Sequence, residues 1–284
     1  MSLKERLWDF LKSEKCLTEI YDEFCDETPS TIRGRLNENV GVCFKRIARG
    51  VYLAICGDVQ AVIIQGDSWS VLKDLEDESI DAIVMDSPYS VLDQQMQRGT
   101  TRKRNLNKGW DFETKDLDEA FYLELHRVIK PGGHMFSFMP PVRNDTWAYL
   151  MEQIEVAMGA GWIFNAQWVW DKKKISLGYN GRPRHELIHF FSKGKRRLFG
   201  SGHPMRATPD VLAHSSEHHV YKKHQTQKPI ELIARLVGFS TQPNEVVLDP
   251  FGGSLSTAAA CLQMQRNCIT IEIDGGMIRS CMNL

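Results

Sequence analysis

The chain has 284 residues, of which 42% are hydrophobic and 25% are charged, and its formal net charge is −1. These values are ordinary for a globular protein with room for one large α/β domain and a small one, and they argue against a nucleic-acid coat protein. No apolar run is long enough to span a bilayer, and the N-terminus lacks a signal-peptide pattern, so we expect a cytoplasmic protein without a membrane partner. The seven cysteines show no C-x-x-C pair and no zinc spacing, which predicts free thiols and no metal site.

Residues 1–55 are expected to form a separate small helical domain. Apolar residues recur at helical spacing through residues 3–24, and Thr28-Pro29-Ser30-Thr31 supplies capping residues and an early proline for a further helix. Short helices followed by a β turn resemble a winged helix-turn-helix. Its recognition helix would carry Ser30, Thr31, Arg33 and Arg35. A helical cap or a dimerisation module is the alternative.

The pattern of residues 60–284 predicts an α/β domain with a mostly parallel sheet. Short apolar strands alternate along the chain with amphipathic helices. The expected strands lie at residues 61–65, 80–85, 135–139, 246–248 and 268–273. The expected helices lie at residues 70–75, 116–129, 147–157, 229–237 and 254–264.

Two further segments interrupt this alternation. Strand patterns at residues 162–170 and 186–191 are joined by a basic, glycine-containing stretch, which predicts an antiparallel hairpin at the sheet edge. Residues from about 195 to 223 have little periodicity and are rich in His, Pro and Ser. We therefore expect them to form an inserted target-recognition segment rather than part of the core.

The strand at residues 80–85 ends at Asp86-Ser87-Pro88-Tyr89. Proline prevents the strand from continuing, so a carboxylate, a constrained backbone and an aromatic ring follow at its carboxyl end. In open α/β sheets this edge is where ligands bind. Taken alone, the stretch is more typical of a strand followed by a Ser-Pro turn, and the rest of the chain favours a site.

A second segment has the pattern of a nucleotide-binding β-loop-α-β unit. A strand is followed by the turn Asp249, Pro250, Phe251, Gly252, Gly253 and Ser254, and then by a helix rich in small residues. Glycines allow a ligand to approach the backbone, and a helix N-terminus offers free N–H groups. Glu272 lies 23 positions after Asp249, a spacing at which an acid binds ribose hydroxyls in such units. Because the turn is not G-x-G-x-x-G, a dinucleotide is not favoured.

Several of these segments together resemble the β-class DNA amino-methyltransferases. Residues 86–89 resemble their D-P-P-Y catalytic motif, and residues 249–254 resemble their S-adenosylmethionine (SAM) motif. Residues 223–229, KHQTQKP, are similar to their H-P-T-Q-K-P stretch, and residues 127–133, RVIKPGG, to a turn found across SAM enzymes. Further matches are Trp170-Asp171-Lys172 and His185-Glu186. The resemblance covers roughly residues 60–274, and the order of the motifs implies a circularly permuted, Rossmann-like SAM-dependent fold.

The resemblance also implies roles for individual residues. An exocyclic amine is a poor nucleophile because its lone pair is delocalised into the ring; Asp86 and the Ser87 carbonyl would accept its two hydrogens. Tyr89 would stack on a base that has left the duplex, and Pro88 completes the motif. The predicted cofactor residues are Asp67 at the SAM adenine, Glu272 at its ribose, residues 249–254 along it, and His224, Thr226 and Lys228 at its methionine end. The alternatives are a helix cap for Asp67, a surface histidine for His224 and an exposed strand end for Glu272.

The expected partner is double-stranded DNA. A basic run without acids would clamp its phosphates through Arg98, Arg102, Lys103, Arg104 and Lys108. Methylation at cytosine C5 is disfavoured, because it needs a nucleophilic cysteine after a proline and no cysteine here follows one. The setting would be a bacterial or phage-infected cell, in association with the nucleoid. Dimers are common in the β class, and the sequence leaves open whether this chain forms one.

We therefore predict a SAM-dependent DNA methyltransferase that acts on adenine N6 in a specific sequence. The alternatives are cytosine N4, a protein glutamine or RNA base, and a DNA-binding protein that no longer turns over. Three departures from the family pattern concern this site: Ser87 replaces a proline, Leu255 replaces a usual glycine, and the chain ends soon after Asp274 without the helix often found there. We expect Leu255 to crowd the cofactor or to shift the start of the helix.

Overall fold

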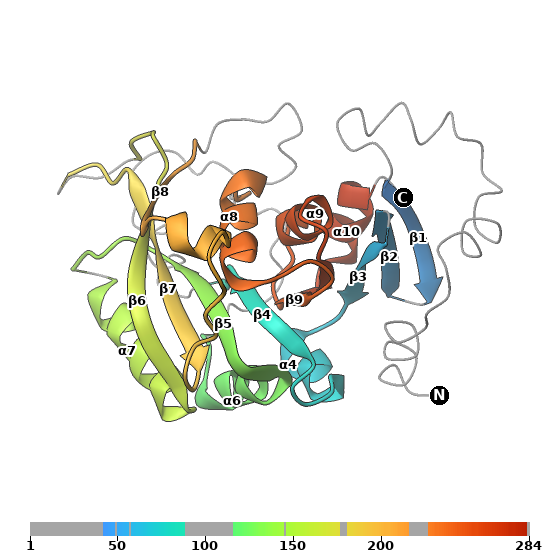
Figure 1. The fold of residues 1–284 in the computed structure, drawn as a ribbon, viewed down its shortest axis with the longest axis horizontal. Helices are drawn as coiled ribbons and strands as arrows, with labels where there is room; N and C mark the ends of the chain where they lie inside the picture. Colours follow the sequence, from blue (N-terminus) through green and yellow to red (C-terminus); the bar gives the residue numbers. More distant parts are fainter. Residues whose placement is uncertain are drawn as a thin grey trace, which may run out of the picture.

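The computed structural model describes residues 50–88 except 57, residues 116–215 except 145 and 177–180, and residues 227–282, together with the backbone of residues 42–48. Within these residues the strands form one 10-stranded sheet in the order β1-β2-β3-β10-β9-β4-β5-β7-β6-β8 (Figure 1). The strands are β1 (Val42–Ala48), β2 (Val51–Cys56), β3 (Val59–Gln65), β4 (Ile80–Met85), β5 (Ile129–Met139), β6 (Trp162–Asp171), β7 (His185–Lys193), β8 (Val211–Ala213), β9 (Val246–Asp249) and β10 (Asn267–Glu272).

The centre of the sheet is parallel and its flanks are largely antiparallel. Strands β3, β10, β9, β4 and β5 run in the same direction. The predicted hairpin is confirmed, because β7 pairs antiparallel with both β5 and β6. The short strand β8 adds in parallel to β6. This is the mostly parallel α/β architecture that the sequence predicts.

The other flank of the sheet corrects the expected domain boundary. Strands β1 and β2 pair antiparallel with each other, and β2 pairs antiparallel with β3. Alternate residues of β2, Val51, Leu53 and Ile55, are buried, because they cover the same core as β3. Residues 42–56 therefore belong to the main sheet and not to a separate N-terminal unit. The rest of the predicted winged-helix segment, residues 1–41 with its expected helices, lies outside the described residues.

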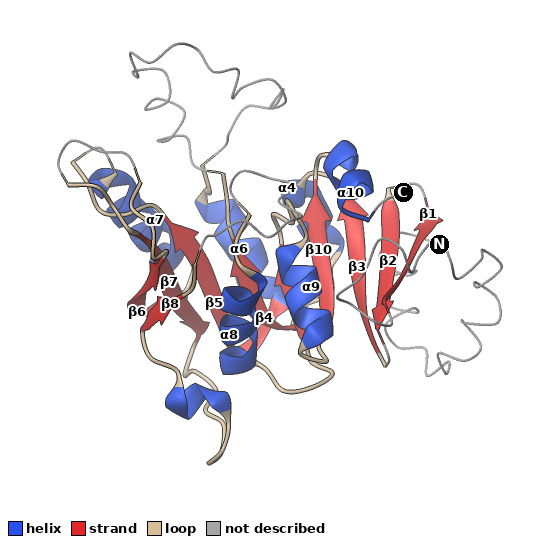
Figure 2. Cartoon of the chain, turned by 90° about the horizontal axis from the view of Figure 1, so that it is seen from above, coloured by secondary structure: helices blue, strands red, loops and turns tan. Residues whose placement is uncertain are grey.

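Helices cover both faces of the sheet (Figure 2). They are α4 (Ser68–Val71), α6 (Glu119–Val128), α7 (Trp147–Gly159), α8 (Ile230–Ser240), α9 (Ser256–Gln263) and α10 (Gly275–Met282), with the 3-10 turns η1 (Leu72–Asp74) and η2 (Pro204–Ala207). One core joins Leu236 of α8, Ala260 of α9 and Ile278 of α10 to the sheet, and the other joins Leu72 and Phe121 to the opposite face. The helix α10 corrects the expectation that no helix follows Asp274.

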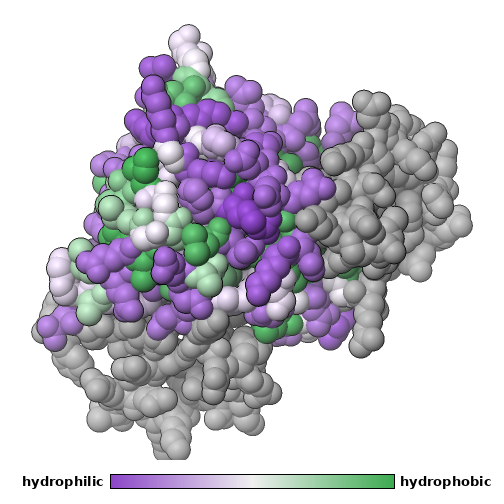
Figure 3. Space-filling model, turned by 90° about the horizontal axis from the view of Figure 1, so that it is seen from below, coloured by the Kyte–Doolittle hydropathy of each residue, from purple (hydrophilic) through white to green (hydrophobic). Residues whose placement is uncertain are grey.

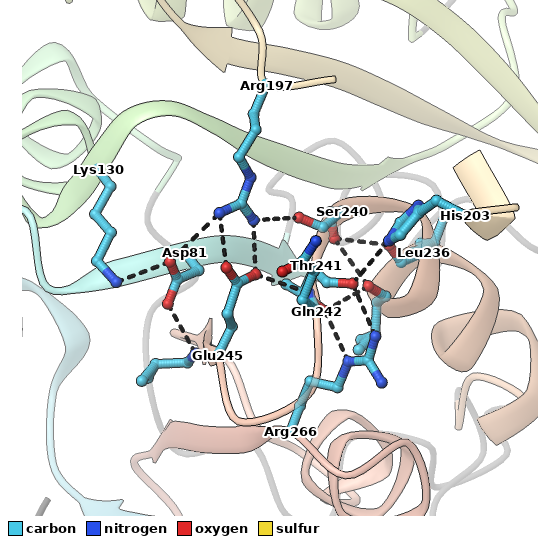
Figure 4. Close-up of polar contacts among 12 residues, drawn as sticks. Asp81, Lys130, Arg197, His203, Leu236, Ser240, Thr241, Gln242, Glu245 and Arg266 are labelled. Carbon is cyan, nitrogen blue, oxygen red and sulfur yellow. Dashed lines mark hydrogen bonds and ion pairs between the residues drawn. The ribbon is translucent and has the colours of Figure 1, made fainter. Parts of the chain in front are cut away.

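The amino ends of the central strands are tied together by a polar network (Figure 4). Asp81 of β4 is 3% exposed; its carboxylate lies 2.8 Å from Lys130 Nζ and accepts the Val246 N–H at 3.0 Å. Arg197 forms two hydrogen bonds with Glu245, at 2.8 and 2.7 Å. Because Arg197 follows β7 and Glu245 precedes β9, this pair fixes the start of the predicted recognition segment to the sheet.

The described surface is mixed in polarity. Hydrophilic side chains dominate the face seen in Figure 3, and apolar side chains are interspersed among them. In the part of the chain that the structure describes, no helix is both long enough and apolar enough to cross a membrane.

Candidate active site

The carboxyl ends of four neighbouring parallel strands place acidic residues along one edge of the sheet. Asp86 follows β4, Asp249 ends β9, Glu272 ends β10 and Asp67 follows β3. The register aligns these ends, because Ile83 pairs with Leu248, Asp249 with Thr270, and Glu272 with Gln65. Segments that are far apart in the sequence thus meet at the edge where open α/β sheets bind ligands.

Asp86 is held by a lysine from a distant part of the chain. Lys228 Nζ lies 2.5 Å from Asp86 Oδ2 and 3.5 Å from Glu186 Oε2. Burial opposes the charge of Lys228, yet the attraction of Asp86 and Glu186 outweighs it and raises the pKa of Lys228. The family resemblance implied that Lys228 binds the methionine end of the cofactor. In the structure its ammonium instead pairs with the predicted catalytic carboxylate.

The residues after Asp86 leave the strand at once. Ser87 is 2% exposed, and Pro88 follows it in irregular backbone. Burial raises the pKa of Tyr149 in α7, and the proximity of the Ser87 hydroxyl opposes this rise. The serine that replaces the family's proline is therefore packed against α7.

The turn after β9 has the tight geometry that its glycines predict. Gly253 has φ +48°, and a Cβ on Gly252 would lie only 2.9 Å from Thr270 Cγ2. Leu255 has φ +61°, in the left-handed region that favours glycine, which explains why the family usually has glycine there. Its side chain packs into the core and α9 begins at Ser256, so the helix start is shifted from the predicted residue 254.

Glu272 closes this turn from the neighbouring strand. Its Oε2 accepts the Gly253 N–H and its Oε1 accepts the Asp274 N–H, both at 2.7 Å. Burial raises the pKa of Glu272, and the two backbone hydrogen bonds oppose this rise. Each carboxylate oxygen has a second acceptor position, so the group can also accept hydrogen bonds from hydroxyls.

Asp249 is the most buried acid of this edge, at 4% exposed. Burial raises its pKa to about 7, with smaller contributions from the charges of Asp86 and Glu272. Its Oδ1 accepts the Phe251 N–H at 2.9 Å, which orders the turn. The ionised forms of Asp249 and Glu272, with the charge that Asp86 keeps beside Lys228, create a negative potential that suits a cationic ligand.

Asp67 acts as a helix cap. Its Oδ2 accepts the Ser70 N–H at 3.1 Å, the arrangement that the alternative explanation of this residue expects. The neighbouring Ser68 hydroxyl donates to the Pro250 carbonyl, which joins this turn to the turn after β9. Phe251, in the turn after β9, stacks on Phe121 of α6, and the two ring centroids lie 5.5 Å apart.

Part of the predicted site lies outside the described residues. These residues are Tyr89, Arg98, Arg102, Lys103, Arg104, Lys108, His224 and Thr226. Conversely, no role was predicted from the sequence for Glu186, which the structure brings to within 3.5 Å of Lys228. The match of His185-Glu186 to the family was the only signal in the sequence, and it did not indicate this contact.

Known DNA methyltransferases are similar to this chain in sequence. The family model of DNA methylase, of the N6/N4 methyltransferase type, matches residues 80–283. The type II methyltransferase M.HpaI of Haemophilus parainfluenzae is 30% identical over 234 residues, which cover 75% of this chain and 70% of that protein.

Two solved structures share the fold. The M1.HpyAVI–SAM complex has a TM-score of 0.55 at 20% identity, covering 78% of this chain and 97% of that one. The cytosine-N4-specific PvuII DNA methyltransferase has a TM-score of 0.57 at 18% identity, covering 78% of this chain and 85% of that one.

Proposed function

Because this chain belongs to the N6/N4 DNA methylase family, we propose that it transfers a methyl group from SAM to an exocyclic amino group in double-stranded DNA. The observation that carries the proposal is the alignment of Asp86 with Asp249 and Glu272 at one sheet edge. Asp86, which would bind the target amine, then lies at the same sheet edge as Asp249 and Glu272, which would bind a cationic cofactor.

The residues of this edge fit SAM. Glu272 keeps acceptor positions that suit ribose hydroxyls, and the acids Asp249 and Asp86 suit a sulfonium cation. Apart from its chain neighbours, the described residues place no atom closer than 3.9 Å to a Cβ built on Gly253, which leaves room for a ligand beside this part of the turn. Bound SAM supplies an electrophilic methyl group on a positively charged sulfur. We propose that Asp67 also contacts the adenine of SAM, in addition to capping α4.

The chain's own residues would make the amine reactive. Asp86 would accept one amino hydrogen and the Ser87 carbonyl the other, which favours a more tetrahedral nitrogen with an available lone pair. After transfer, the carboxylate of Asp86 would take up or relay the released proton. Tyr89 and the basic residues 98–108 are proposed to hold the flipped base and the DNA backbone.

We propose adenine N6 as the target atom, because the motif begins with Asp86, where serine is common in cytosine-N4 enzymes. The family includes both activities, and PvuII is a cytosine-N4 enzyme with the same fold. The two bases present similar amino groups, so the distinction depends on the pocket around the base.

The test is methyl transfer from labelled SAM to unmethylated DNA, to RNA and to protein. Label in DNA alone supports the proposal, and digestion to nucleosides then identifies N6-methyladenine or N4-methylcytosine. Label only in RNA or protein, or binding of DNA without transfer, would contradict it. The same assay on cytoplasmic extract of cells that express the chain checks the expected compartment.

A further inference from the structure

Glu186 lies at the carboxyl edge of the sheet, although it comes from an antiparallel strand. Leu187 of β7 pairs with Met139 at the end of β5, and Ser137 of β5 pairs with Met85 at the end of β4. Glu186 precedes Leu187 and therefore lies beyond the end of β5, next to the turn that begins at Asp86. The proposed mechanism does not use this carboxylate.

Glu186 is part of a row of four alternating charges. Lys228 Nζ lies between Asp86 Oδ2 at 2.5 Å and Glu186 Oε2 at 3.5 Å, and Lys172 Nζ lies 3.2 Å from Glu186 Oε1. The Lys228 side chain is only 8% exposed and its ammonium lies 5.1 Å from the centre of the Phe138 ring. A charge in such a place is stable only if anions compensate it. Lys228 donates a hydrogen bond to Asp86 and forms a longer ion pair with Glu186, so both acids compensate its charge.

This division bears on the reaction. If Asp86 were the only anion next to Lys228, it would be fully neutralised by the ammonium and would be a weaker acceptor for an amino hydrogen. The Lys228 ammonium is attracted by Glu186 as well as by Asp86, so it neutralises Asp86 only in part. Lys172 compensates the negative charge of Glu186 on its other side. Asp86 thereby keeps negative charge for the substrate.

We infer that Glu186 is a positioning residue for methyl transfer, which holds the Lys228 ammonium between itself and Asp86 so that Asp86 can accept the target amine. The inference rests on the proposed function. It assigns Glu186 an action through Lys228 and no contact with substrate.

The first experiment compares Glu186→Gln with the unsubstituted chain in single-turnover methyl transfer to DNA. Glutamine keeps the size of the side chain and removes its charge, and we expect the rate to fall about tenfold. Glu155→Gln, at an exposed site on α7, is the matched control and should leave the rate unchanged. Thermal unfolding of both variants checks that they are folded.

A double-mutant cycle with Lys228→Met separates positioning from a merely structural role. Because Glu186 acts through the ammonium, Glu186→Gln should have little further effect when Lys228 is already methionine. Rate losses that simply multiply, or a Glu186→Gln variant as fast as the unsubstituted chain, would overturn the inference. If the unsubstituted chain transfers no methyl group to DNA, the proposed function fails and the inference falls with it.

The alkaline limb of the pH–rate profile gives a second readout, even if Glu186→Gln proves unstable. The charged groups that face Lys228 are Asp86 and Glu186, with Lys172 and Asp249 behind them. Glu186→Gln should move the limb to lower pH, because an anion that stabilises the ammonium is gone. Lys172→Gln should move it to higher pH, because a repelling cation is gone. Shifts of the same sign in both variants would contradict the inference.

Discussion

Lys228 Nζ and Asp86 Oδ2 lie 2.5 Å apart, although the two residues are 142 positions apart in the sequence. The contact joins the end of β4 to the residues that precede α8. It also brings a buried cation to the carboxylate that the family resemblance identifies as catalytic. The predictions below test what the residues of this edge, and those of the opposite edge, contribute to activity and stability.

Replacement of Asp86 by asparagine should reduce methyl transfer by about a hundredfold to a thousandfold. Asparagine keeps the shape but cannot take up the amine proton, and a positioned acid–base group contributes factors of roughly this size. The measurement is single-turnover transfer at saturating SAM, with SAM affinity determined separately. The control is Asp58→Asn, at an exposed turn between β2 and β3. A fully active Asp86→Asn variant would contradict the assignment.

The Ser87→Pro variant, which restores the family motif, should remain active within about threefold of the unsubstituted chain, less than 1 kcal/mol in activation free energy. The proposed contribution of this residue is its backbone carbonyl, which proline also has. Initial rates on the same DNA provide the measurement. A loss of ten times or more would show that the serine hydroxyl or N–H is needed, for example through its contact with Tyr149.

The stability of the fold should fall as pH rises from about 4 to about 7, partly because of Asp249. Burial raises the pKa of this carboxyl from 3.8 to about 7, so in this range the folded state retains a proton that the unfolded state has lost. The corresponding decrease in the free energy of unfolding is at most about 4 kcal/mol and is complete above pH 7.

Urea unfolding of the unsubstituted chain and of Asp249→Asn, at about pH 5 and about pH 8, measures this contribution. Asparagine does not titrate, so the variant should lose less stability between the two pH values. Glu272 also has a raised pKa and is present in both proteins. Asp249→Asn also removes the repulsion between the two carboxylates, so the comparison measures the titration of Asp249 together with this repulsion. An equal pH dependence in the two proteins would refute the assignment.

Replacement of Asp81 by alanine should lower the free energy of unfolding by about 3 kcal/mol. The substitution leaves the Val246 N–H without its acceptor and Lys130 without its partner, next to the Arg197–Glu245 pair. Urea unfolding provides the measurement, and Asp58→Ala at an exposed turn serves as the control. Equal stabilities of the two variants would show that the network at the amino edge contributes nothing.

The local pattern of the sequence was sufficient to predict most of the elements of the main domain, but not β1, β2, β8 or α10. Strand β4 is apolar apart from Asp81 because it is buried on both faces, and helix α6 shows an apolar stripe because only one side of it meets the sheet. The acids at the ends of β4, β9 and β10 could be found for the same reason, since each follows directly on a buried strand.

The sequence alone did not predict the contacts that depend on how strands are ordered. The sequence pattern predicts a separate unit for residues 1–55, because nothing local distinguishes a strand that joins a distant sheet from one in a small domain. The row Asp86, Lys228, Glu186 and Lys172 has members up to 142 positions apart, and only the pairing of β4, β5 and β7 brings them together. Residue types and local periodicity thus determined the elements and the candidate chemistry. The tertiary structure decided which charges neutralise one another, because Coulomb attraction depends on distance in space and not on separation along the chain.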